Sequence, residues 1–69
     1  MALKIRYSKY AREQMVLRGI TEREVEEGIR KGIKQFQPPN KILSEYSYYT
    51  VVYKKIKDTC FVITIKPRW

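Results

Sequence analysis

The residues best suited to chemistry in this sequence are its cations and its tyrosines. Fifteen Lys and Arg stand against seven Asp and Glu, with six Tyr and no His. Cations contact phosphates, and aromatic rings stack on unpaired bases. Acid–base chemistry without His would use Tyr as a proton donor and a carboxylate such as Glu13 or Glu45 as the base. The composition favours a polyanion, and nucleic acid in particular, as the ligand.

The net charge of +8 on 69 residues is large for so short a chain. Such a charge attracts polyanions, whose counterions are released on binding. Two other interpretations remain: the cations only keep a small domain soluble, or they meet an acidic protein. The length predicts a single domain over residues 1–69, with core packing or association as its source of stability.

Neither a membrane segment nor a metal site is expected. No apolar run approaches the roughly 20 residues of a membrane span, and the N-terminus lacks the apolar stretch of a signal peptide. We therefore expect a cytoplasmic protein. Cys60 is the single cysteine and there is no His, so the sequence predicts no internal disulfide, no zinc site of the usual kind and no cofactor.

Two short helices are expected to meet at a glycine. Ser8 can cap a helix over about residues 9–18, and Gly19 can end it in the left-handed conformation. Thr21 begins a capping box for a second helix over about residues 22–31. Such a pair also occurs in DNA-binding helix-turn-helix domains, but the strands that follow argue against that class.

Four strands are expected around these helices. Apolar and polar residues alternate over residues 3–8, which is typical of a strand with one buried face. Pro38-Pro39 marks a connection or a sheet edge. The segments after it are rich in Ile, Val, Tyr, Phe and Thr and predict an antiparallel meander over residues 41–46, 48–55 and 60–66.

The expected fold is α+β, in the order β-α-α-β-β-β, with both helices on one face of a small antiparallel sheet. Phe61, Ile63 and Ile65 share one face of the last strand and are the expected core residues there. The pattern over residues 48–55 does not show which face of that strand is buried. Either Lys54 or Lys55 would therefore lie on the face that the helices leave uncovered. The candidate nucleic-acid-binding residues are Lys4, Arg6, Lys54, Lys55, Lys66 and Arg68. Trp69 would cover the core or stack on a base.

The first helix resembles the signature of a bacterial and archaeal family, domain of unknown function four-two-five-eight, which runs roughly S-x-H-A-x-x-R-M-x-x-R-G-I-S/T. Seven residues fit this pattern: Ser8, Ala11, Met15, Arg18, Gly19, Ile20 and Thr21. Tyr10 stands where the family usually has His, and Gln14 where it usually has Arg.

This family, and the order of elements, resemble the RelE/barnase-like (BECR) toxin superfamily. The resemblance implies a small basic protein that binds RNA, with endoribonuclease action on mRNA and neutralisation by an acidic antitoxin. It also implies Tyr10 and Arg18 as catalytic residues, acting as proton donor and phosphate-binding group. Packing of the Tyr10 ring and a helix-end charge on Arg18 are the structural alternatives.

Two further hypotheses stay open for the molecule as a whole. One is a non-catalytic module that binds RNA or protein and has lost its active site, with Tyr10 and Gln14 marking the loss. The other is a homodimer that buries Tyr-rich strand surface.

Overall fold

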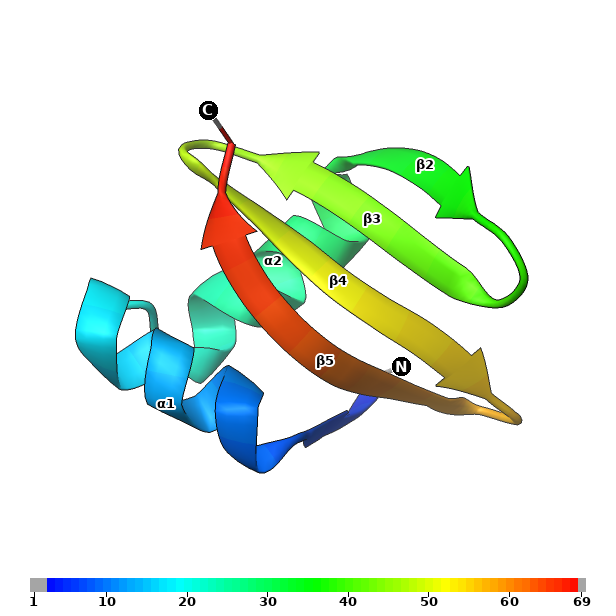
Figure 1. The fold of residues 1–69 in the computed structure, drawn as a ribbon, viewed down its shortest axis with the longest axis horizontal. Helices are drawn as coiled ribbons and strands as arrows, with labels where there is room; N and C mark the ends of the chain where they lie inside the picture. The colour runs from blue at the N-terminus through cyan, green and yellow to red at the C-terminus, as the bar shows by residue number, and fades with distance from the viewer. Residues whose placement is uncertain (1–2, 69) are drawn as a thin grey trace.

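A computed structural model describes residues 3–68. It confirms the α+β class and the two helices on one face of a sheet, and it adds one strand to the four expected (Figure 1). The elements are β1 (Lys4–Tyr7), α1 (Lys9–Arg18), α2 (Glu22–Lys31), β2 (Ile33–Gln37), β3 (Lys41–Tyr46), β4 (Tyr49–Ile56) and β5 (Thr59–Pro67).

The five strands form one mixed sheet in the order β1-β5-β4-β3-β2. β1 runs parallel to β5, and the other three pairs are antiparallel. The prediction of an entirely antiparallel sheet was therefore wrong at β1. The two helices connect β1 to β2, which lies at the opposite edge of the sheet and runs antiparallel to β1. The three reversals from β2 to β5 then leave β5 parallel to β1.

The additional strand, β2, lies where a connection was the first expectation. It forms an edge of the sheet and pairs with β3 across a turn that contains Pro38-Pro39. All five of its residues are exposed. An edge strand with no buried face lacks the alternation that identifies strands in a sequence.

Both helices have the predicted caps. The Ser8 hydroxyl accepts a hydrogen bond from the Ala11 amide at 2.9 Å, and Gly19 ends α1 with φ of 68°. Thr21 and Glu24 form the predicted capping box at the start of α2. Because these signals are local, the bounds of both helices agree with the expected ranges.

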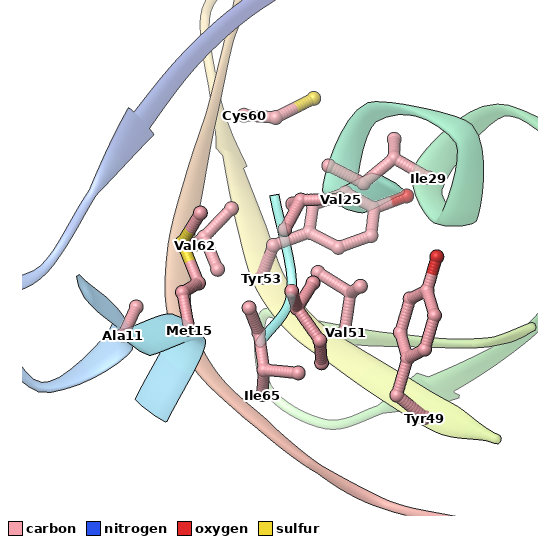
Figure 2. Packing of buried hydrophobic residues seen from close by; sticks show 11 residues of the cluster. Ala11, Met15, Val25, Ile29, Tyr49, Val51, Tyr53, Cys60, Val62 and Ile65 are labelled. Atoms are coloured by element: carbon pink, nitrogen blue, oxygen red, sulfur yellow. The ribbon is translucent and has the colours of Figure 1, made fainter. Parts of the chain in front are cut away.

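The core lies between the helices and the sheet. Figure 1 shows α2 passing behind β4, and α1 beside β5. Figure 2 shows side chains of both layers in this cluster, among them Val25 of α2 and Tyr53 of β4. The buried members are Ala11, Met15, Ile20, Val25, Ile29, Tyr49, Val51, Tyr53, Cys60, Val62 and Ile65.

A β-bulge in β5 changes which of its residues are buried. Val62 pairs with Tyr53 and Thr64 pairs with Val52, so Ile63 is the extra residue. The side-chain alternation reverses across such a bulge. The prediction of Ile65 as a core residue is confirmed, but it was wrong for Phe61 and Ile63, which are only partly buried.

Candidate nucleic-acid interface

The face of the sheet that the helices leave uncovered, called the open face below, collects cations from three strands. Paired residues in a sheet point to the same face, so the register decides each position. Lys4 and Arg6 pair with Thr59 and Phe61, while Ile5 between them packs against the core. Lys4 and Arg6 of β1 therefore lie on the open face.

On β4 the register separates the two adjacent lysines. Tyr53 is a core residue, so Lys54 points to the open face, where it pairs with Phe61. Lys55 pairs with the buried Cys60 and points to the helix side. Of the two candidates, the structure brings Lys54 together with the β1 cations and leaves Lys55 apart.

The centre of the open face is neutral. Thr50 and Val52 of β4 are 3% and 6% exposed. Their register partners are Glu45 and Leu43 on β3 and Lys66 and Thr64 on β5. The charged side chains therefore lie around a small centre of hydroxyl and methyl groups.

A carboxylate and two cations gather at one end of this face. Glu45 of β3 and Lys66 of β5 both pair with Thr50 of β4, so the three form a row across the strands. Arg68 lies beside the row, with its Nη2 3.9 Å from Glu45 Oε1. Its Nη1 donates to the Ser47 carbonyl at 3.0 Å, which holds the guanidinium against the β3–β4 turn.

A second row, at the other end of the open face, was not foreseen from the sequence. Arg6 of β1, Phe61 of β5 and Lys54 of β4 are register partners in succession. The Lys54 ammonium lies 5.9 Å from the centroid of the Phe61 ring. Phe61 was missed because an uninterrupted strand would have placed it in the core with Ile65.

Tyr10 and Arg18, the two predicted catalytic residues, are not part of this arrangement. Both lie on α1, which packs against β5 and β1 through the covered side, and their positions are about 12 Å apart along the helix axis. Tyr10 is 57% exposed, so its ring is not packed under the helix. The Arg18 Nε donates to Gln14 Oε1 at 3.2 Å, one turn earlier on the helix.

The tyrosines with altered acidity face the helices. Burial, followed by the nearby Glu24 and Glu27 carboxylates, raises the pKa of Tyr49 to about 12. Its hydroxyl donates to the Glu24 carbonyl at 2.6 Å. Burial is also the main cause of the raised pKa of Tyr7 and of Tyr53. These hydroxyls stay protonated near neutral pH and serve the packing between sheet and helices.

The remaining predicted features concern metals, membranes and the last residue. Burial raises the pKa of the Cys60 thiol, as expected of a packed strand residue. Within residues 3–68, no group of three or more His, Cys, Asp or Glu side chains could hold a metal ion. No helix of that part of the chain has the length and apolar character needed to cross a membrane. Trp69 lies outside the described residues.

Comparison of the sequence with protein-family models and with curated proteins finds no match. No protein-family model matches it, so the predicted membership of the domain of unknown function four-two-five-eight has no support from that comparison. No curated protein matches it either.

Comparison of the structure identifies a fold. A chain of the toxin–antitoxin complex RelBE2 from Mycobacterium tuberculosis superimposes with a TM-score of 0.69 at 15% sequence identity. The match covers 99% of this chain and 100% of that one. At this level of identity the likeness concerns the fold, and this chain has the RelE-like arrangement of two helices on a five-stranded mixed sheet.

Proposed function

We propose that this protein is a RelE-like toxin that holds single-stranded RNA on its open face. The observation that carries the proposal is the convergence there of Lys4, Arg6, Lys54 and Lys66 from β1, β4 and β5. Cations arranged across a sheet with an aromatic ring among them suit an unpaired strand, whose phosphates and bases are both accessible. The likeness to a chain of a toxin–antitoxin complex supports the same class by analogy of fold.

The row of Glu45, Thr50 and Lys66, with Arg68 beside it, has the groups that RNA cleavage by transesterification requires. Glu45 takes the proton of a 2′-hydroxyl, whose oxygen then attacks the adjacent phosphorus. Lys66 and Arg68 stabilise the charge that develops on the phosphoryl oxygens. The Lys66 ammonium then donates a proton to the departing 5′-oxygen, which leaves a 2′,3′-cyclic phosphate. In this proposal the protein is an endoribonuclease that needs no His.

This proposal assigns the chemistry to the open face instead of to Tyr10 and Arg18. A phosphate held by Lys66 lies on the other side of the sheet from α1, which packs through Ala11 and Met15 onto the covered face. Tyr10→Phe and Arg18→Ala are therefore expected to leave cleavage within about twofold of the wild-type rate. A loss of cleavage in either variant, with the fold intact, would return the catalytic role to α1.

An acidic antitoxin is the partner we propose for the same surface. Binding of carboxylates to the open-face cations would exclude RNA, and the charge of +8 favours such a partner. Action on mRNA would place both partners in the cytoplasm.

The decisive binding experiment uses two adjacent lysines that carry the same charge on opposite faces. Affinity for a 2′-O-methyl oligouridylate, which cannot be cleaved, is measured for wild type, Lys54→Ala and Lys55→Ala. We expect Lys54→Ala to weaken binding and to lower the salt dependence by about 0.7 in the logarithmic slope, as for one lost phosphate contact on a single strand. Lys55→Ala is expected to change neither. Equal effects of both substitutions would contradict an RNA site on the open face.

Cleavage is tested separately with unmodified RNA and Glu45→Gln. This substitution removes the base and keeps the size of the side chain, so we expect cleavage to fall at least about 100-fold while binding is retained. A wild type that binds RNA and leaves it intact would identify the non-catalytic binding module. A wild type that neither binds nor cleaves RNA would contradict the proposed function altogether.

A further inference from the structure

We infer that Phe61 is a stacking platform for one unpaired base, at the end of the open face far from Glu45. The inference deepens the proposed function and depends on it, since it names the part of the RNA that a specific side chain recognises. Thr50 and Lys54, which mark the two rows, are about 13 Å apart along β4. The stacking position is thus separate from the row assigned to cleavage.

The neighbours of Phe61 favour a nucleotide over a purely apolar ligand. The ring is partly exposed on a face with no helix over it, and Arg6 and Lys54 are its register partners on the two adjacent strands. A cation on each side can contact the phosphates that flank a base stacked on the ring. The Lys54 ammonium, 5.9 Å from the ring centroid, already stabilises the ring by a cation–π contact, and Arg6 on the other side adds a second cation within reach of a stacked nucleotide.

A groove gives this platform room for a ligand. It has a volume of about 740 Å³ and lies at the sheet edge formed by β1, next to the β4–β5 turn. That volume is within the range of small-molecule sites, so it accommodates a nucleotide. Its lining includes Arg6, Ile56, Lys57, Asp58, Thr59 and Phe61.

The charges around the groove leave it suited to an anion. Asp58 is the acidic residue of its lining, and the Asp58 carboxylate pairs with the Lys4 ammonium at 3.1 Å. Arg6 and Lys57 line the same groove, whereas Arg12, also in the lining, is paired with the Glu22 carboxylate at 2.9 Å. The cations therefore outnumber the single, already paired carboxylate.

The test compares strands that differ only in their bases. Wild type is expected to bind a short 2′-O-methyl oligouridylate about 10-fold more tightly than an abasic strand with the same number of phosphates. Phe61→Leu is expected to bind both strands equally, because the leucine has no flat ring. Phe61→Trp is expected to restore the preference for the strand with bases.

Phe36→Leu is the matched control. The chain has two phenylalanines, and Phe36 is exposed on β2 and pairs with Ile42, on the helix side of the sheet. Its substitution should leave the preference for bases unchanged, and thermal unfolding shows whether each variant is folded.

The outcomes separate the two proposals. If Phe61→Leu is folded and keeps the wild-type preference, or if wild type binds both strands equally, the stacking platform is wrong while RNA binding by the cations stands. A wild type that binds neither strand overturns both proposals. If Phe61→Leu does not fold, Phe61→Trp decides: a tryptophan variant that binds both strands equally contradicts the platform, and one that keeps the preference supports it.

Discussion

Tyr49 joins the central strand to α2 through one hydroxyl group. Its side chain is fully buried, and the hydroxyl donates to the Glu24 carbonyl in the first turn of the helix. Ionisation would place a negative charge in that buried position, close to the Glu24 and Glu27 carboxylates. The protonated form is therefore the one that the fold stabilises.

The raised pKa of Tyr49 predicts that the contribution of this residue to the free energy of unfolding depends on pH. The pKa of Tyr49 in the folded protein, about 12, lies above the ordinary tyrosine value of 10.0. The stabilisation is therefore present in full below pH 10 and is lost as the pH rises toward 12. We expect Tyr49→Phe to lower the free energy of unfolding by about 1 kcal/mol at neutral pH through the lost hydrogen bond. The difference from wild type should shrink across that alkaline range.

Urea unfolding at a series of pH values measures this effect. Tyr48→Phe is the control, because Tyr48 is exposed and directly precedes Tyr49 in the sequence. A constant difference between wild type and Tyr49→Phe from pH 7 to 12 would show that the hydroxyl has no raised pKa in the folded state.

Among the elements, α1 and β5 are tied together by Ser8. The Ser8 amide donates to the Val62 carbonyl at 2.9 Å, and its hydroxyl donates to the Ile63 carbonyl at 2.7 Å while accepting from the Ala11 amide. One residue thus caps the helix and satisfies the backbone of the bulged residue. Thr21, in contrast, caps α2 at an exposed position through bonds within its own capping box.

This difference predicts that the two caps contribute unequally to the free energy of unfolding. Ser8→Ala should lower the free energy of unfolding by about 2 kcal/mol, since it removes a cap and leaves a carbonyl in the bulge without its donor. Thr21→Ala should cost about 1 kcal/mol, as for a cap alone. Chemical denaturation of both variants gives the comparison, and equal losses would mean that the bond to Ile63 contributes nothing.

The elements also show why parts of the fold were predictable and others were not. The helices follow from caps that act within a few residues, so Ser8, Gly19 and Thr21 predicted their bounds. The bulge at Ile63 depends on the pairing between β4 and β5, which no local pattern contains. Both faces of β4 are buried from Tyr49 to Tyr53, so alternation could not decide between Lys54 and Lys55.

At the scale of the whole molecule, several cations are concentrated on one face, which the net charge alone does not reveal. The net charge of +8 predicted a polyanion, but the composition could not say where the cations gather. The strand order and the register bring Lys4, Arg6, Lys54 and Lys66 to one face. The helix side presents mixed charge, with pairs such as Arg12–Glu22 and Lys31–Glu27.

This distribution predicts how RNA binding responds to salt. Four phosphate contacts on a single strand give a slope of about −3 for the logarithm of the association constant against the logarithm of salt concentration. Titration of a 2′-O-methyl oligouridylate at several potassium chloride concentrations measures the slope. A value near zero would exclude binding through these cations, whereas a value of about −6 would mean that the whole net charge of +8 takes part.

The extra residue of the bulge, Ile63, determines which side chains of β5 lie on the same face. Phe61 and Lys66 are separated by an odd number of positions, so a regular strand would direct them to opposite sides. Pairing of β5 without the bulge, at the same chain length, would leave every proposed RNA-contacting residue in the chain, yet one half of the strand would have to turn over. The two ends of the proposed RNA site would then no longer share a surface, although the composition and charge of the protein would be unchanged. Deletion of Ile63, in contrast, would leave an even separation of four positions, and both ends would stay on one face.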